Sequence, residues 1–259
     1  MSTYSGLCQA RVDLEAIRNN VNILARANAG VPLLADVSAD GYGHGAVPIA
    51  RAAIEAGAGW LGVGSVADAA LLRLAGITAP ILASIPTPAY DAGSAKDLGV
   101  VLRGRSDELD ALYDPGPALY GLGIECTQLG VVAAMRVSTT VIGTKTIERG
   151  DGVSYGYTFR AIETTNLAMV AMGYADGLDR CAGNVAAMEL GGKSRRIAGR
   201  VAMNAAVLNL GQDSVGLGDE AVLFGAGGEP TASRWAHSVG ITDVEVVTVF
   251  GRMLARSYG

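Results

Sequence analysis

One stretch of this chain reads Pro32-Leu-Leu-Ala-Asp-Val-Ser-Ala-Asp-Gly-Tyr-Gly-His-Gly45, and an alanine-rich segment follows it directly. The apolar run at its start, bounded by turn residues, predicts a short strand over Leu33–Ser38. The glycines predict a turn, and Ala46–Ala56 is expected to be a helix. The stretch therefore predicts one strand-turn-helix unit, which is the building block of a parallel sheet.

The same unit recurs through the first half of the chain. Asp13 is a good N-cap for a helix with apolar residues at helical spacing that ends near Gly30. Further strands are expected at Trp60–Gly64, Pro80–Ser84 and Val100–Leu102, and further helices at Ala67–Ala75 and Ser106–Leu112. A closed barrel of such units takes about 250 residues, whereas residues 31–121 have room for only about three to five strands. We therefore expect an incomplete TIM-like β/α barrel.

The pattern changes from about residue 122 onward. Runs rich in Val, Ile, Thr and Met are separated by glycine-rich turns, which is typical of antiparallel sheet. Strands are expected at Val131–Lys145, Asn166–Gly173, Met188–Leu190, Arg196–Leu210, Glu220–Phe224 and Val244–Phe250, with one helix at Ala232–Val239. The sequence thus predicts a barrel domain over residues 1–121 and a mainly antiparallel β domain over residues 122–259.

Composition limits the classes of partner. The chain of 259 residues is 50% hydrophobic, only 17% charged and carries a net charge of −5, so it can bury a core and offers no basic surface for nucleic acid or anionic lipid. The N-terminus lacks a signal sequence, and the most apolar window contains a charge and two helix breakers, so we predict a cytoplasmic protein. The three cysteines have no CxxC spacing, which indicates neither a disulfide framework nor a zinc site.

Several segments together resemble the alanine racemase family, in that family's order, over nearly the whole chain. The opening stretch is similar to the strand that binds pyridoxal phosphate in these enzymes. The other matching segments are Pro115-Gly-Pro-Ala-Leu-Tyr-Gly121, Gly152-Val-Ser-Tyr-Gly156, Gly173-Tyr-Ala-Asp-Gly177, Gly199-Arg-Val-Ala-Met-Asn204 and Arg252-Met-Leu-Ala-Arg-Ser-Tyr258. The resemblance implies a barrel followed by a C-terminal β domain, and a homodimer whose active sites are shared between subunits.

The chain departs from that family where the cofactor is held. Ser38 stands at the position of the lysine that forms the Schiff base, and Asp114 stands where the family has an arginine facing the pyridine nitrogen. Pro117 replaces an isoleucine of the phosphate cradle and has no N–H to donate. The helix that resembles the one after the fourth strand ends at Tyr113 and runs directly into the segment that resembles the eighth strand. We therefore expect no cofactor and no ordinary racemase activity, because a serine cannot form an imine.

Three residues are candidates for catalysis. If Ser38 points into the former cofactor pocket, the alternation of side chains along a strand places Asp36 on the same face. A buried carboxylate needs a partner or a proton, so Asp36 is either an acid or base, or it is reached by water and bonds to the backbone. Tyr155 matches the family tyrosine that reaches into the partner's barrel. The histidine that activates it belongs to the missing segment, so Tyr155 is either a hydrogen-bond donor or a relic of the fold.

A second set of side chains is expected to contact substrate, while His44 is expected to hold the strand-helix turn. The predicted substrate-binding residues are Tyr42, Tyr174, Asp176, Met203, Asn204 and Asp114.

Two functions from different classes remain open. The first is an enzyme of bacterial specialised metabolism that works without pyridoxal phosphate on a small molecule, by proton transfer, elimination or cyclisation. The second is a non-catalytic relative that binds a metabolite or a partner protein. Racemisation with another amine is disfavoured, because Lys96, Lys145 and Lys193 lie outside the matched strand. A homodimer is expected in either case, since an incomplete barrel leaves strand edges to cover.

Overall fold

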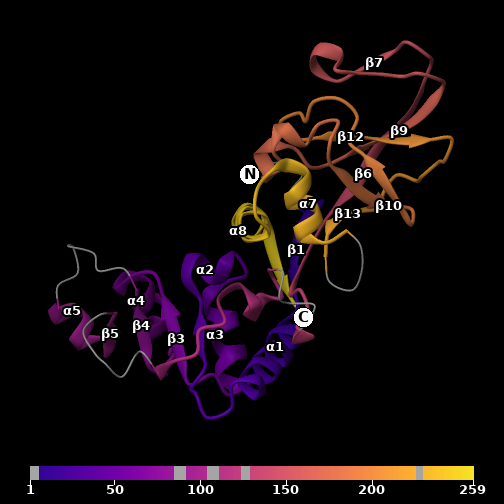
Figure 1. The fold of residues 1–259 in the computed structure, drawn as a ribbon. Helices are drawn as coiled ribbons and strands as arrows, with labels where there is room; N and C mark the ends of the chain where they lie inside the picture. Colours follow the sequence, from indigo (N-terminus) through magenta and orange to yellow (C-terminus); the bar gives the residue numbers. More distant parts are fainter. Residues whose placement is uncertain (1–5, 85–91, 104–110, 124–128, 226–229) are drawn as a thin grey trace. The chain divides into compact units, whose positions relative to one another are not determined.

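The computed structural model describes residues 6–84, 92–103, 111–123, 129–225 and 230–259, which form two compact units (Figure 1). The α/β unit comprises Asp13–Ala134 with Gly259, and the β unit comprises Met1–Val12 with Met135–Tyr258. In the described part of the chain, no helix combines the length and the apolar character needed to cross a membrane.

The α/β unit contains a four-stranded parallel sheet in the order β2-β3-β4-β5. These strands are β2 (Leu34–Asp36), β3 (Trp60–Val63), β4 (Ile81–Ala83) and β5 (Val100–Leu102). Sequential strands are neighbours in the sheet, as expected for repeated β-α units. The predicted partial barrel is confirmed.

Helices alternate with these strands. Three of them, α1 (Leu14–Ala27), α3 (Ala46–Glu55) and α4 (Val66–Leu74), lie where the sequence predicts helices. The other helical segments, which the sequence does not predict, are α2 (Ser38–Tyr42), α5 (Ala92–Asp97) and the 3-10 turn η2 (Gly116–Tyr120). Asp13 caps α1 by accepting from the Ala16 amide over 3.0 Å, and Ser65 begins α4 in a capping box with Asp68. The helix predicted at Ser106–Leu112 lies largely outside the described residues.

The outer edge of β2 is covered by the segment that precedes η2. Leu33 forms a parallel bridge with Tyr113, whose carbonyl accepts from the Leu34 amide over 2.9 Å. The fully buried Asn20 fixes the continuation of this segment, because its side-chain amide donates to the carbonyls of Leu119 and Val132 over 3.0 and 2.8 Å. The segment that begins at Tyr113 is thus held between β2 and α1.

The β unit is built around an eight-stranded sheet. Its strands are β1 (Cys8–Val12), β6 (Met135–Ile147), β9 (Thr165–Val170), β10 (Ala187–Leu190), β11 (Lys193–Arg196), β12 (Ala206–Gly211), β13 (Glu220–Phe224) and β14 (Ala255–Tyr258); a separate hairpin joins β7 (Gly152–Val153) to β8 (Phe159–Arg160). Its 3-10 turns are η3 (Tyr155–Tyr157), η4 (Tyr174–Asp176) and η5 (Arg180–Ala182). All pairings are antiparallel except that of β1 with β14, which confirms the predicted antiparallel character.

Two predicted strands of this unit are wrong. The run Arg196–Leu210 is split, because β11 ends at Arg196 and β12 begins only at Ala206. Val244–Phe250 is helical and lies within α8 (Asp243–Met253), which follows α7 (Ala232–Val239). A capping box outweighs the β propensity of the valines here: the Glu245 amide donates to the Thr242 hydroxyl over 3.2 Å, and the Thr242 amide donates to the Glu245 carboxylate over 2.8 Å.

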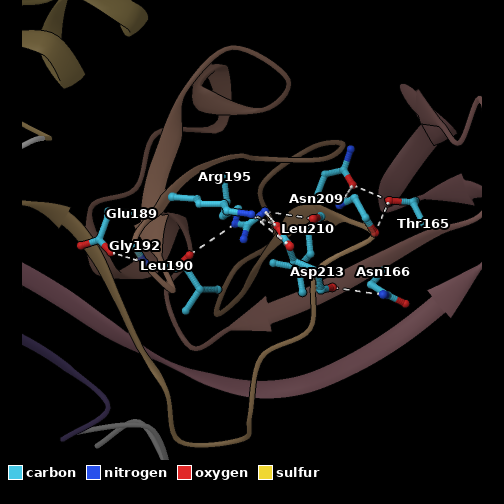
Figure 2. Close-up of polar contacts among 11 residues, drawn as sticks. Thr165, Asn166, Glu189, Leu190, Gly192, Arg195, Asn209, Leu210 and Asp213 are labelled. Atoms are coloured by element: carbon cyan, nitrogen blue, oxygen red, sulfur yellow. Dashed lines mark hydrogen bonds and ion pairs between the residues drawn. The ribbon is translucent and has the colours of Figure 1, made fainter.

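A buried arginine ties the β10–β11 hairpin to the end of β12 (Figure 2). The Arg195 guanidinium donates to the carbonyls of Leu190 and Leu210 over 3.3 and 2.9 Å, and pairs with Asp213 over 2.8 Å. Burial of a charged group is expensive unless it is paired and hydrogen-bonded, and Arg195 meets both conditions.

Candidate functional site

The Asp36 carboxylate at the end of β2 receives three hydrogen bonds from its own chain. One oxygen accepts from the Ser38 amide over 2.9 Å and from the Ser38 hydroxyl over 2.5 Å. The other accepts from the Tyr42 hydroxyl over 3.2 Å. The half-buried carboxylate therefore has polar partners, which is the condition for keeping a charge in this position.

The reason predicted for the proximity of Ser38 to Asp36 is wrong. β2 ends at Asp36, and Ser38 is the first residue of α2, so strand alternation does not relate the two side chains. They meet because an aspartate can bond to the backbone amide two residues later, which closes a tight turn.

An unusual left-handed turn brings Tyr42 back toward Asp36. Ala39, Asp40, Gly41 and Tyr42 have φ values of 51°, 59°, 63° and 51°. Each non-glycine residue in this conformation costs about 1–2 kcal/mol. The turn is held by a bond from the Gly41 amide to the Val37 carbonyl over 2.8 Å, and by one from the Ala46 amide to the Asp40 side chain over 2.8 Å. Backbone strain of this kind is concentrated at functional sites, so the turn is a candidate part of one.

Tyr120 completes the cluster and was missed by sequence reasoning. Its hydroxyl donates to the backbone carbonyl of Asp36 over 2.8 Å, and its ring centroid lies 4.9 Å from that of Tyr42 and 4.6 Å from that of His44. The signal that could have found it is the segment Pro115–Gly121, which resembles the last barrel strand of the family. The buried His44 ring lies with Nδ1 3.1 Å from the carbonyls of both Gly41 and Tyr42, a position suited to holding the turn.

Asp114 places a second carboxylate near Asp36. It follows Tyr113, and its side chain accepts from the Gly116 amide over 2.9 Å. Burial raises the pKa of Asp114, and the negative charge of Asp36 raises it further. Burial also raises the pKa of Tyr42 and of Tyr120, with Asp36 again contributing. Both phenols therefore stay protonated near neutral pH and act as donors.

The remaining predicted residues lie in the β unit. The η4 turn and the loop at Met203 are hydrogen-bonded together, since the Ala175 amide donates to the Met203 carbonyl over 2.9 Å. Asp176 accepts from the Gly173 amide over 2.9 Å and so shapes the turn, while Tyr174 is 39% exposed under the Arg180 guanidinium. Asn204 follows Met203 in the same loop.

Tyr155 lies in the turn between β7 and β8. It is 66% exposed. The preceding Ser154 has a φ of 59°, and its hydroxyl donates to the Arg200 carbonyl over 2.6 Å, which anchors the turn. The site residues predicted from the sequence thus form three groups. Asp36, Ser38, Tyr42 and Asp114 gather in the α/β unit; Tyr174, Asp176, Met203 and Asn204 gather in the β unit; and Tyr155 lies on an exposed turn of the β unit.

Comparison with known proteins gives consistent matches along the chain. Residues 12–112 match the family described as "Alanine racemase, N-terminal domain", and residues 134–258 match "Alanine racemase, C-terminal domain". An alanine racemase of Thermobifida fusca is 32% identical over 370 aligned positions, covering 98% of each chain. One of Salinispora tropica is 34% identical, covering 94% of this chain and 95% of the relative. The crystal structure of alanine racemase from D-cycloserine producing Streptomyces lavendulae superposes with a TM-score of 0.86 at 28% identity, covering 100% of this chain and 98% of that one.

Proposed function

This chain belongs to the alanine racemase family, and we propose that it has left that family's cofactor chemistry and moves a proton on a small-molecule substrate without pyridoxal phosphate. The observation that carries the proposal is the hydrogen bond of 2.5 Å from the Ser38 hydroxyl to the Asp36 carboxylate, at the position where the family pattern has an amine.

The residues present do not fit a covalently held pyridoxal phosphate. Its tether requires a primary amine, and position 38 offers a hydroxyl that is already bonded to Asp36. Lys96 is exposed on α5, and Lys145 and Lys193 belong to strands of the β unit. None of these lysines lies in β2 or in the turn directly after it.

The charges near the site also disfavour a phosphate. Asp36 and Asp114 lie within electrostatic range of each other. Arg103 lies within electrostatic range of Asp114, but no described cationic side chain forms an ion pair with either carboxylate. Two neighbouring carboxylates repel an anionic ligand. Pro117, in the segment that resembles part of the phosphate cradle, has no amide hydrogen to donate.

We further propose that the middle of the barrel is missing. The alignment with the Thermobifida fusca relative spans 370 positions, whereas this chain has 259 residues, so at least 111 of those positions face gaps in this chain (370 − 259). The parallel bridge of Tyr113 with Leu33 supports the same view, because it places the residue directly before the segment that resembles the eighth strand against the start of the first strand of the sheet.

In the proposed reaction the Asp36 carboxylate accepts a proton from the substrate. The hydroxyls of Ser38 and Tyr42 donate hydrogen bonds to the charge that develops on a substrate oxygen, and Asp36 returns the proton in an isomerisation. Elimination and cyclisation share the first of these steps. Tyr155 supplies a further donor from the partner subunit of a homodimer.

A non-catalytic binding protein is the second candidate. It is favoured by the state of Asp36, both of whose oxygens already accept hydrogen bonds from Ser38 and Tyr42. A base must release such partners, or share them with substrate, before it can take a proton. A binding site has no such requirement.

Exchange in deuterium oxide distinguishes these candidates whichever of the three reactions takes place, because each begins with removal of a proton from the substrate. Pools of small amino and hydroxy acids are incubated with protein that has been dialysed against hydroxylamine, and deuterium at carbon is detected by NMR. We expect protein-dependent exchange that is lost in Asp36→Asn and retained in Asp97→Asn, an exposed aspartate at the end of α5. Exchange that needs added pyridoxal phosphate contradicts the proposal, and binding without exchange supports the second candidate.

Mixing variants tests whether the site is shared between subunits. If Tyr155 acts in the partner's site, Asp36→Asn and Tyr155→Phe are each inactive, but a mixture regains up to about a quarter of the parent activity through hybrid dimers. No recovery on mixing, after subunit exchange is demonstrated with a tagged chain, rules out a shared site. Exchange unchanged in both single variants shows that the proposed catalytic residues are wrong.

A further inference from the structure

A pocket of the β unit is lined by none of the site residues predicted from the sequence. Its volume is about 410 Å³, and it is formed by the β10–β11 hairpin and by α7. The polar and aromatic side chains that line it are Glu189, Ser194, Arg196, Arg234, Trp235 and Ser238.

The register of the hairpin explains why these side chains share one face. Arg196 lies opposite Ala187, and Ser194 lies opposite Glu189, in an antiparallel pair whose facing residues point to the same side. On α7, Arg234 and Ser238 are four residues apart and so lie on one side of the helix, next to Trp235. Each of the two elements, β11 and α7, therefore contributes one arginine and one serine hydroxyl to the same cavity.

The two adjacent arginines of β11 point to opposite faces of the strand. Arg195 points to the buried face, where Asp213 and two carbonyls satisfy it (Figure 2). Arg196 points to the other face because side chains alternate along a strand, and its guanidinium forms no hydrogen bond or ion pair with the residues that the structure describes. An arginine on the wall of a cavity without such a partner can bind an external anion.

Glu189 is the acidic side chain among these lining residues, and it already accepts a hydrogen bond within the hairpin. One oxygen of Glu189 accepts from the Gly192 amide over 2.9 Å in the hairpin turn (Figure 2). Arg136 lies within electrostatic range of the same carboxylate. Among the described lining residues, two arginines, Arg196 and Arg234, thus accompany one carboxylate.

We propose that this pocket binds a small molecule that carries an oxyanion group, either carboxylate or phosphate. Arg196 and Arg234 hold the anion, the hydroxyls of Ser194 and Ser238 donate to it, and the rest of the ligand lies against Trp235. Guanidinium groups match the geometry of both anions, and the volume falls within the range of about 300–1,000 Å³ found for small-molecule sites. The site is independent of the proposed reaction at Asp36.

Trp235 provides a direct readout of binding. The chain has two tryptophans, and Trp60 lies in β3, so a Trp60→Phe variant leaves Trp235 as the single indole fluorophore. The probes are inorganic phosphate and citrate, each titrated at constant ionic strength maintained with sodium chloride. We expect a saturable change in Trp235 emission with at least one probe, and the probe that acts identifies the anion as phosphate or carboxylate.

Arginine variants then test the assigned contacts. In the Trp60→Phe background, Arg196→Gln is expected to raise the Kd at least about tenfold, the effect of losing one hydrogen bond to a charged group. Arg26→Gln, on the exposed face of α1, is the matched control and should bind as its parent does. Circular dichroism verifies that both variants are folded. No saturable change with either probe, or equal binding by the two arginine variants, would overturn the proposal.

Discussion

The Ser38 hydroxyl donates to the Asp36 carboxylate over 2.5 Å, at the point where β2 ends and a left-handed turn begins. We propose that this bond occupies the position at which the family pattern has an amine, and that the Asp36 carboxylate is the reactive group. The Asp36 carboxylate also accepts a hydrogen bond from the Tyr42 hydroxyl. The Asp36 side chain thus joins the end of β2 to both ends of α2. If these contacts stabilise the fold, their loss should be measurable in the free energy of unfolding.

Removal of the Ser38 hydroxyl should measurably weaken the α/β unit. Ser38→Ala leaves Asp36 with one donor fewer, which should cost about 1 kcal/mol of unfolding free energy. Urea unfolding followed by circular dichroism measures the loss. The control is Ser84→Ala, an exposed serine after β4 whose loss should change stability by less than about 0.5 kcal/mol. Equal stability of the two variants would show that the bond contributes nothing.

Gly121 should be indispensable for the segment that carries Tyr120. It has a φ of +70°, and a Cβ there would overlap the carbonyl of Val132. Gly99 has a similar φ of +61° with no atom within 4 Å of the added Cβ. Gly99→Ala should therefore cost only the conformational penalty of about 1–2 kcal/mol. Gly121→Ala should cost at least about 2 kcal/mol more than that. Similar melting temperatures for the two variants would contradict the close approach at Val132.

Acid stability should depend in part on Glu220. Its hydrogen bonds to Arg136 lower the pKa of Glu220 from 4.5 to about 2. Because the pKa is lower in the folded state, this stabilisation is present above pH 4.5 and is lost as the pH falls from 4.5 toward 2. The side chain is 46% exposed, so the contribution should be below about 1 kcal/mol.

Glu220→Gln isolates that contribution. The variant should lose less stability than its parent between pH 4.5 and 2 in urea titrations, whereas Glu163→Gln, at an exposed loop position, should follow the parent. An unchanged slope in Glu220→Gln would show that the pair with Arg136 does not persist in solution.

The adjacent arginines of β11 should differ sharply in their effect on stability. Arg195→Met removes hydrogen bonds to two carbonyls and the pair with Asp213, and it should cost about 2 kcal/mol or more. Arg196→Gln touches none of these and should stay within about 0.5 kcal/mol of the parent. Chemical unfolding of the two variants side by side measures the difference. The reverse order of stability would mean that the faces of β11 are assigned wrongly.

The parts of the fold that follow from local signals could be predicted from the sequence. The spacing of apolar residues, the caps and the glycine turns predicted β2 to β5 and α1, because each signal lies within a few residues of the element it specifies. The strand predicted at Val244–Phe250 is wrong. The β-branched residues favour a strand, whereas the capping box at Thr242 starts a helix. The break in Arg196–Leu210 depends on tertiary packing: Gly199 has a φ of +77°, and a Cβ there would overlap the Val153 carbonyl.

The candidate site was only partly predictable. Asp36 and Ser38 were expected together, but from strand alternation, whereas a tight turn joins them. The left-handed conformation of Ala39, Asp40 and Tyr42 cannot be derived from residue preferences, because those side chains disfavour it. Tyr120 lies 84 residues from Asp36 in the chain, and its contact depends on how the segment after Tyr113 lies against β2.

Borohydride reduction after incubation with pyridoxal phosphate tests the proposed loss of the cofactor. The folded protein is incubated with the cofactor, reduced, dialysed and analysed by intact mass and peptide mapping, and racemisation of alanine is assayed in parallel. We predict no stoichiometric adduct, only slight labelling of exposed lysines such as Lys96, and no racemisation. One adduct per chain at a single lysine, accompanied by racemisation, would show that the protein remains a pyridoxal phosphate enzyme.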